Sequence, residues 1–202
     1  VEGLGYDLNK VKVLIHQFIT ITKGEEKVKM STRKANFITL EELCNEVGSD
    51  VLRYFFIMRG MNTHLNFDID LAKNESDENP VYYLQYAYAR ICNIIKRANS
   101  FGHIIKYDIV IENLNTKIEQ LLIRKLIEFP NIINRIGDIL EPQILANYLQ
   151  EISSLFHRFY GLNRVITDNE KLTQERLILT EATKILLKNG KNILGISIRE
   201  KM

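Results

Sequence analysis

The chain has 202 residues, of which 46% are hydrophobic, and this is enough to bury a core in one large domain or two small ones. Lysine and arginine total 27 against 25 aspartates and glutamates, so the global charge does not indicate a nucleic-acid-binding protein, and any RNA contact must come from local patches. With few prolines, no tryptophan and no hydrophobic run near the roughly 18 residues of a membrane span, we expect a soluble, cytoplasmic, mainly helical protein.

The first predicted element is a strand. Residues 11–22 (VKVLIHQFITIT) are rich in β-branched and aromatic side chains with partial alternation, and a turn at 23–26 follows them. Val28 and the pair 37–38 could add short extended pieces to this strand. The chain starts at Val1 without a methionine and reaches the strand pattern almost at once, so we expect a piece of a longer protein.

A basic segment, residues 29–34 (KMSTRK), follows the strand. Between residues 23 and 34 five lysines and arginines stand against Glu25 and Glu26, although the whole chain carries a net charge of only +2. Concentrated, movable cations are what a polyphosphate needs, and a loop between a strand and a capped helix could close over one. On composition alone, a solvated charge run is the simpler explanation.

Two short helices are predicted next. Thr39 and Glu42 have the spacing of a capping box, in which each side chain satisfies a backbone donor of the other residue, and Gly48 ends this helix. Ser49 is predicted to cap the second helix, which ends at Gly60.

Residues 61–78 are polar and weakly periodic, and we interpret them as a connector with one helical turn that contains the domain boundary. Asn79 and Pro80 then form a strong helix start, and the helix runs to about Asn99. Further helices are predicted at about 118–126, 131–140, 141–165 (the longest) and 173–188, the last of which ends at Asn189 and Gly190.

The cysteines and histidines show no pattern typical of a metal site. Cys44 and Cys92 match no ligand spacing, and we interpret them as single thiols in core packing. We expect Asp68 and Asp70 to cap a helix or to face solvent. Neither a metal nor a nucleophilic triad is expected from the histidines, which share no helical face: His16, His64, His103 and His157.

The segment at 29–34 resembles the KMSKS-type signature of class I aminoacyl-tRNA synthetases. Four further blocks follow it in order, and together the five resemble bacterial arginyl-tRNA synthetase over essentially the whole chain. These blocks are 37–43 (FITLEEL), 50–56 (DVLRYFF), 68–72 (DIDLA) and 79–90 (NPVYYLQYAYAR).

The resemblance implies an ATP-side loop that stabilises the transition state of arginyl-adenylate formation. Thr32 stands where many class I enzymes have the second lysine of the signature, so Arg33 or Lys34 must supply that charge. Ala35 replaces a glycine that is usual in the family, which affects the expected loop mobility. ATP with Mg²⁺ would act as a substrate. The implied catalytic positions are Lys29, Ser31, Thr32, Arg33 and Lys34, and the implied ATP contacts are Lys29, Met30, Ser31 and Arg33.

The helical part resembles the all-α anticodon-binding domain of the family, known as the DALR domain. Bases of an unwound loop stack on aromatic rings and guanidinium planes, and nearby cations contact phosphates. We interpret Tyr82 and Tyr148 as packing residues, and Tyr88, where the family often has histidine, is expected to face the core. The implied tRNA contacts are Tyr83, Tyr86, Arg90, Lys96 and Arg97, with Tyr160 and Met202 as weaker candidates.

The predicted fold is therefore mainly α. Residues 1–60 would be the tail of a Rossmann-like class I catalytic domain, residues 61–78 a connector and residues 79–202 the helical anticodon-binding bundle. The full-length protein would be a monomeric ligase that attaches arginine to its tRNA. The HIGH-type motif and the arginine pocket of the family are absent from these residues, so we predict that this chain alone is inactive as a ligase.

Three alternatives remain at this point. One is a non-catalytic helical RNA-binding module, and another is a protein-interaction bundle with no nucleic-acid role. The third is the C-terminal portion of cysteinyl-tRNA synthetase, against which the block at 79–90 argues.

Overall fold

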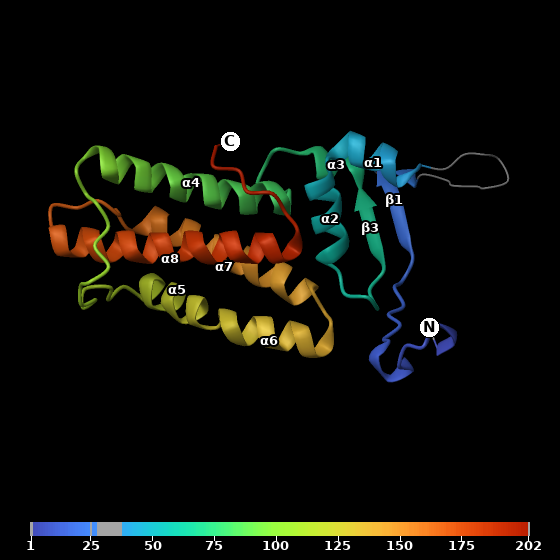
Figure 1. The fold of residues 1–202 in the computed structure, drawn as a ribbon. Coiled ribbons are helices and arrows are strands. Elements are labelled where there is room, and N and C mark those ends of the chain that lie inside the picture. Colours follow the sequence, from blue (N-terminus) through green and yellow to red (C-terminus); the bar gives the residue numbers. More distant parts are fainter. Residues whose placement is uncertain (1, 25, 28–37, 202) are drawn as a thin grey trace.

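The computed structural model describes residues 2–24, 26–27 and 38–201. A small sheet with short helices lies at one end, and five longer helices form a bundle beside it (Figure 1). This mainly helical architecture confirms the predicted fold class. The elements are the 3-10 helices η1 (Glu2–Leu4) and η2 (Leu8–Lys10), the strands β1 (Ile19–Lys23), β2 (Glu26–Lys27) and β3 (Leu65–Asp68), and the helices α1 (Leu40–Val47), α2 (Ser49–Ile57), α3 (Ile69–Lys73), α4 (Pro80–Ser100), α5 (Lys117–Ile127), α6 (Phe129–Ile139), α7 (Gln143–Leu162) and α8 (Glu170–Leu194).

The sheet is built around β1, with the strand order β2-β1-β3. β1 runs antiparallel to β2 and parallel to β3, and Ile19 lies opposite Leu65. Phe67 of β3 is fully buried and packs edge-on against Phe55 of α2, with the ring centroids 5.5 Å apart. One face of the sheet is therefore covered by the short helices.

The segment 61–78 contains the predicted helical turn as α3, and it also contains the strand β3, which was not predicted. The capping role predicted for Asp68 is confirmed: its side chain accepts hydrogen bonds from the backbone N–H groups of Asp70 and Leu71 at the start of α3. The sequence analysis missed β3 because four residues are too few to show a clear alternation of apolar and polar side chains, and because its partner β1 lies far away in the sequence.

Only the last part of the strand predicted at 11–22 is a strand. Residues 11–18 form no regular element, and Val13, Ile15 and Phe18 are each more than four-fifths exposed. The pairing of β1 with β3 starts at Ile19. A high β-propensity does not make a strand where no partner strand is available, so the prediction over residues 11–18 was wrong.

The capping box of α1 is confirmed. The Thr39 N–H donates to the Glu42 carboxylate over 2.7 Å, and the Glu42 N–H donates to the Thr39 hydroxyl over 3.1 Å. Gly48 ends α1 as predicted, with a φ of +86°. The same glycine is also the N-cap of α2, so Ser49 is already the first helical residue and the predicted Ser49 cap was wrong. Helix α2 ends at Ile57, before the predicted Gly60.

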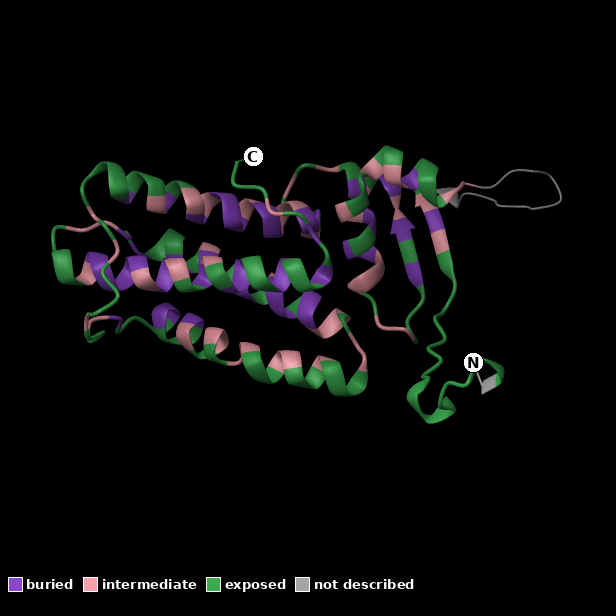
Figure 2. Ribbon diagram, in the orientation of Figure 1, coloured by how far each residue is buried: buried purple, intermediate pink, exposed green. Residues whose placement is uncertain are grey.

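The core of the bundle lies between α4, α7 and α8, and helices α5 and α6 cover one side of it (Figure 2). The predicted start of α4 is confirmed, because the Asn79 side chain accepts hydrogen bonds from the backbone N–H groups of Val81 and Tyr82. Tyr88 is 2% exposed and faces the core, as predicted. Tyr148, predicted to be a packing residue, is also buried.

The sequence predicted that the helix at 141–165, which corresponds to α7, would be the longest. Among the described helices α8 is longer, so this prediction was wrong. Helix α8 continues through Asn189 and Gly190, which were predicted to end it, and stops at Gly195 with a φ of +68°. Gly190 serves helix packing instead, because a Cβ atom there would lie 2.5 Å from a methyl carbon of Leu149 on α7. A glycine needed for close approach of two helices looks the same in sequence as a helix stop signal.

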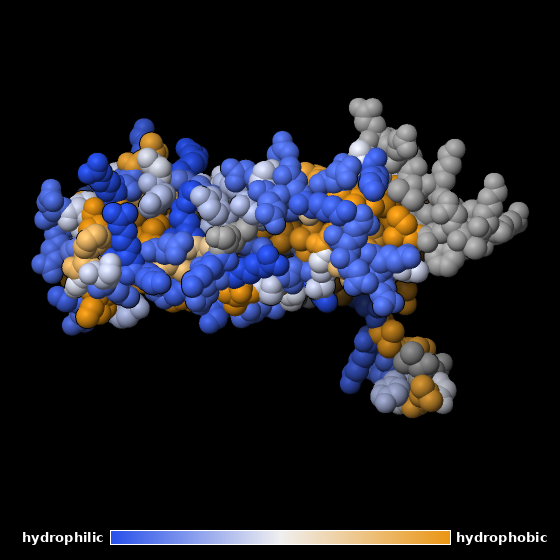
Figure 3. Space-filling view, turned by 90° about the horizontal axis from the view of Figure 1, so that it is seen from above, coloured by the Kyte–Doolittle hydropathy of each residue, from blue (hydrophilic) through white to orange (hydrophobic). Residues whose placement is uncertain are grey.

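None of the described helices is both long enough and apolar enough to cross a membrane. Hydrophilic side chains cover most of the bundle in the view from above, and hydrophobic ones gather towards the end that carries the sheet (Figure 3). Many of the exposed large apolar side chains belong to the N-terminal stretch before and at the start of β1. Those of this stretch are Leu4, Tyr6, Leu8, Val11, Val13, Leu14, Ile15, Phe18 and Ile19.

Lys191 is a buried cation in the C-terminal half of α8. It is 0% exposed, and within the described residues its Nζ atom has no hydrogen-bond partner. It lies 5.0 Å from the centre of the Tyr88 ring. Burial lowers the pKa of Lys191 to about 8, an effect that Asp50 opposes and Arg199 reinforces. The folded state therefore bears the cost of a desolvated charge at neutral pH.

We predict that Lys191→Met raises the free energy of unfolding at pH 7 by on the order of 1 to 3 kcal/mol. The gain should shrink as the pH rises from about 8 to 10.5, because the folded chain releases this proton before the unfolded chain does. Urea denaturation at pH 7 and pH 10 measures both effects. Lys188→Met, at an exposed position of the same helix, is the matched control. A less stable Lys191→Met protein at pH 7 would contradict the prediction.

Candidate nucleic-acid interface

Helices α4 and α7 pack side by side and bring five polar and aromatic side chains into one group, which we call the seam cluster: Tyr83, Tyr86 and Arg90 of α4, and His157 and Tyr160 of α7. Spacings of three and four residues place side chains on one face of a helix. The three α4 residues that the sequence had singled out therefore meet a matching pair on the neighbouring helix.

Arg90 is the centre of the seam cluster. Its guanidinium donates a hydrogen bond to the Tyr86 hydroxyl over 2.6 Å and another to Nδ1 of His157 over 2.9 Å. The same group lies 4.4 Å from the centre of the Tyr86 ring and 5.3 Å from that of Tyr160. Cation–π contacts and hydrogen bonds hold a planar cation between two aromatic rings.

His157 is the residue of this cluster that sequence reasoning missed. Its ring lies 4.8 Å from that of Tyr83 and is stacked on that of Tyr86 at 5.7 Å. Burial, together with the Arg90 charge, lowers the pKa of His157 to about 4. A guanidinium only donates, so Nδ1 accepts and the neutral ring carries its proton on Nε2. The sequence offered one signal for His157, which is its i, i+3 spacing to Tyr160. This spacing does not reveal which helix His157 packs against.

Two adjoining hollows open along the same seam. The smaller, of about 210 Å³, lies over the seam cluster, and the larger, of about 470 Å³, continues towards the end of α4 and the loop after α7. They share Ile94, Arg97 and Tyr160. The smaller is lined by Tyr86, Ala89, Arg90, Asn93, Ile94, Arg97 and Tyr160, and the larger by Ile94, Arg97, Phe101, Tyr160, Asn163, Arg164, Val165 and Ile166.

The seam carries positive charge that the described residues leave uncompensated. None of the ion pairs among the described residues involves Arg90, Arg97 or Arg164. Aromatic faces and guanidinium groups without an ion-pair partner along one groove are what a single-stranded nucleic acid binds, since bases stack on the rings and phosphates pair with the cations.

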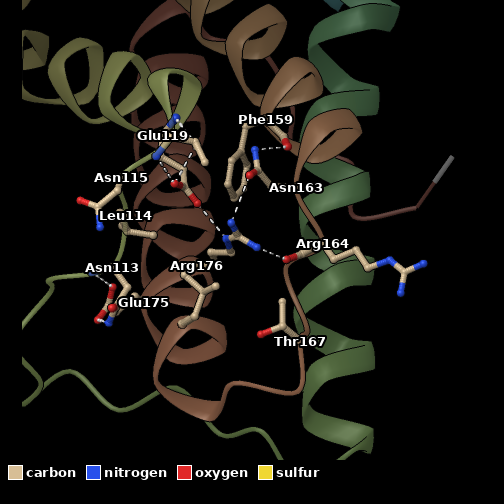
Figure 4. A network of polar contacts seen from close by, with 12 residues as sticks. Asn113, Leu114, Asn115, Glu119, Phe159, Asn163, Arg164, Thr167, Glu175 and Arg176 are labelled. Carbon is tan, nitrogen blue, oxygen red and sulfur yellow. Dashed lines mark hydrogen bonds and ion pairs between the residues drawn. The ribbon is translucent and has the colours of Figure 1, made fainter.

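A buried polar network fixes the loop that borders the larger hollow (Figure 4). The Arg176 guanidinium donates to the Glu119 carboxylate over 2.7 Å, to the Arg164 carbonyl over 2.7 Å and to the Asn163 side-chain oxygen over 3.1 Å. Glu119 is fully buried, and with its other oxygen it accepts hydrogen bonds from Thr116 in the capping box of α5. The network ties α5, the loop and α8 together.

The structure brings most of the predicted tRNA-binding residues to one place. Tyr83, Tyr86, Arg90 and Tyr160 form the seam cluster, and Arg97 borders both hollows. Lys96 is exposed but lines neither hollow. Tyr82, predicted to be a packing residue, is half-buried beside Tyr86, with the ring centroids 6.2 Å apart.

The basic segment and the C-terminal residue lie outside the described residues. The described elements on either side of that segment are β2, which ends at Lys27, and α1, which begins at Leu40. The roles predicted there stay predictions, and they concern Lys29, Met30, Ser31, Thr32, Arg33, Lys34, Ala35 and Met202.

The described residues contain no group of three or more histidine, cysteine, aspartate or glutamate side chains that could hold a metal ion. Cys44 and Cys92 are free thiols, and both are half-buried against the core.

A sequence profile described as "DALR anticodon binding domain" matches residues 84–202, which include α4 from Leu84 onwards and all of α5 to α8. The chain belongs to this family. The seam therefore lies within an anticodon-binding domain, because Tyr86, Arg90 and Tyr160 all fall inside the matched residues. A second profile, described as "tRNA synthetases class I (M)", matches residues 2–98.

Relatives of this DALR-family chain are arginine-tRNA ligases. It is 44% identical over 201 residues to the arginine-tRNA ligase of Salinibacter ruber and 41% identical over 203 residues to that of Desulforamulus reducens. In both cases all of this chain is covered but only 36% of the relative, so the chain spans about a third of the length of these ligases. The resemblance to arginyl-tRNA synthetase is confirmed.

Solved structures agree with this family assignment. A crystal structure assigned to arginyl-tRNA synthetase from Campylobacter jejuni matches with a TM-score of 0.81 at 30% identity, covering 100% of this chain and 43% of that one. The Thermus thermophilus arginyl-tRNA synthetase matches with a TM-score of 0.66 over 85% of this chain and 29% of that one; at 23% identity it shows the fold alone.

The half-buried His157 imidazole makes the stability of the chain sensitive to acid. The pKa of His157 is about 4 in the folded chain against an ordinary value of 6.5, so the unfolded chain binds this proton first as the pH falls. We predict that the chain loses stability between pH 6.5 and 4, and that His157→Gln loses less over this range. Urea denaturation at several pH values measures the difference. His16→Gln removes an exposed histidine and should keep the wild-type profile; identical profiles for all three proteins would contradict the prediction.

Proposed function

We propose that this chain is the part of an arginine-tRNA ligase that binds the anticodon region of its tRNA and supplies the ATP-side loop of the catalytic domain. The observation that carries the proposal is the Arg90 guanidinium, held between the rings of Tyr86 and Tyr160 and open to a hollow, inside a DALR anticodon-binding domain. The identity of the chain to arginine-tRNA ligases supports the choice of tRNA.

RNA recognition at such a seam would use unpaired nucleotides. Anticodon bases are splayed out of a loop, so each can place one face on a tyrosine ring or a guanidinium plane. Arg90 is held in place before RNA arrives, because Tyr86 and His157 already fix its orientation. Its remaining donors and those of Arg97 would meet phosphates or base edges.

The catalytic half of the proposal concerns the full-length enzyme. Lys29, Ser31, Thr32, Arg33 and Lys34 would stabilise the transition state in which arginine attacks ATP to give arginyl-adenylate and pyrophosphate, with Mg²⁺ accompanying the nucleotide. The arginyl group would then pass to the 3′ end of the tRNA. The class I profile over residues 2–98 supports ATP use. We further propose that the enzyme is a cytoplasmic monomer.

The alternatives drawn from the sequence are not favoured. A non-catalytic RNA-binding module and a protein-interaction bundle both fit the bundle alone, but the relatives match the chain over its whole length, including the part before the bundle. These relatives are arginine-tRNA ligases, which argues against a cysteinyl-tRNA synthetase.

Binding of tRNA tests the recognition half. We predict that Tyr86→Ala and Arg90→Ala each weaken the affinity of the chain for arginine-specific tRNA by about 1 to 3 kcal/mol, roughly 5- to 150-fold in Kd, because a stacking platform is lost. Fluorescence titration measures Kd, and circular dichroism checks that helicity is kept. Tyr107→Ala and Arg135→Ala, at exposed positions that line neither hollow of the seam, are matched controls. Unchanged affinity in both seam variants would contradict the proposal that the seam binds tRNA.

Pyrophosphate exchange tests the catalytic half. In the full-length ligase we predict that Lys29→Ala and Arg33→Ala each lower arginine- and tRNA-dependent ATP–pyrophosphate exchange by about 100- to 1,000-fold, because a donor to the transition state is lost. Lys12→Ala, at an exposed position, is the control. The 202-residue chain alone should give no exchange. Full activity in both variants, or exchange by the chain alone, would contradict the proposal.

A further inference from the structure

The larger hollow on the seam has the features of a binding site of its own. It adjoins the hollow over the seam cluster and shares Ile94, Arg97 and Tyr160 with it. An RNA strand that is bound at Arg90 and runs along α4 would therefore enter this second hollow directly. Its volume of about 470 Å³ lies within the range of small-molecule and nucleotide sites.

The lining supplies the two kinds of contact that a nucleotide needs. Phe101 is 61% exposed at the end of α4, and the Arg97 guanidinium lies 5.6 Å from the centre of its ring. Val165, at the base of the hollow, is buried, while Arg97 and Arg164 are exposed. An exposed aromatic ring beside two cations gives a base a stacking surface and gives a phosphate two partners.

The loop that carries Arg164 is fixed in advance. Arg176 binds the Arg164 carbonyl and the Asn163 side chain, and the Asn163 amide donates to the Phe159 carbonyl over 3.2 Å. Figure 4 shows the Arg164 side chain pointing away from Arg176, so that its guanidinium is not used by the network. Because the loop is held through the Arg164 carbonyl and the Asn163 side chain, a ligand that binds the Arg164 guanidinium would not have to order the loop backbone as well.

The groove continues beyond Phe101. A third hollow, of about 520 Å³, is lined by His103, Thr167 and Asp168 as well as by Phe101 and Arg164. The exposed Asp168 carboxylate would repel a phosphate there, which favours the side of the groove between Arg97 and Arg164 for the RNA backbone.

We propose that the hollow between Arg97, Phe101 and Arg164 is a second nucleotide subsite, which takes the unpaired RNA nucleotide next to the one bound at Tyr86 and Arg90. The base stacks on Phe101, and its phosphate pairs with Arg97 and Arg164. This inference rests on the proposed function, because it concerns the same RNA loop. The ligand class is a single-stranded ribonucleotide within an anticodon loop.

The test uses this chain and a stem-loop RNA that carries an arginine anticodon. Phe101→Ala should weaken binding roughly 5- to 150-fold, and Arg164→Ala should lower the slope of log K against log salt by about 0.7, as expected for one lost phosphate contact to a single strand. Both side chains are exposed, so both variants should fold. Ile127→Ala and Arg135→Ala, at exposed positions of α5 and α6, are the matched controls.

A second arm removes single bases from the RNA loop. One abasic position should weaken binding to the wild-type chain but add nothing to the loss in Phe101→Ala, whereas its effect should add to that of Tyr86→Ala. If Tyr86→Ala weakens binding while Phe101→Ala and Arg164→Ala leave both affinity and salt slope unchanged, the second subsite is refuted and the proposed function stands. If Tyr86→Ala and Arg90→Ala are also without effect, the proposed function fails and the subsite fails with it.

Discussion

The loop that borders the larger hollow on the seam depends on the buried ion pair between Arg176 and Glu119. One carboxylate oxygen of Glu119 caps α5, and the other holds the guanidinium that binds the loop after α7. Loss of one partner from such a pair leaves an uncompensated charge in the core, which typically costs about 3 to 5 kcal/mol. The pair thereby ties α5 and α8 to the loop after α7, and Tyr160 and Arg164 both line the larger hollow that this loop borders.

The seam is also joined to the N-terminal part of the chain. The hydroxyl of Tyr54 on α2 donates to the carbonyl of Ala146 on α7 over 2.9 Å, and the Asn79 side chain links the start of α4 to the Ala72 carbonyl of α3. Both helices that form the seam therefore contact the part of the chain that contains β2 and α1.

The sequence predicted features whose determinants are local and left out those that depend on distant partners. The capping box of Thr39 and the Asn79 start of α4 are each set by neighbouring residues, and both are confirmed. Strand β3 and the role of His157 were missed because each depends on a partner far away in the chain. The predicted helix end at Gly190 was wrong because glycine is used both for close packing, here on Leu149, and for helix termination. The seam residues on α4, Arg97 included, came from a family resemblance, whereas Phe101 and Arg164 of the proposed second subsite came from the folded arrangement.

Hydroxyl-radical footprinting of the chain, with and without arginine-specific tRNA, tests most directly whether the seam between α4 and α7 is the face that holds the RNA. Tyr86, Phe101 and Tyr160 should become protected on binding, whereas Ile127 and Ile139, exposed on α5 and α6, should stay as reactive as in the free chain. Protection of Ile127 and Ile139 with unchanged reactivity at Tyr86 and Tyr160 would show that the RNA binds elsewhere.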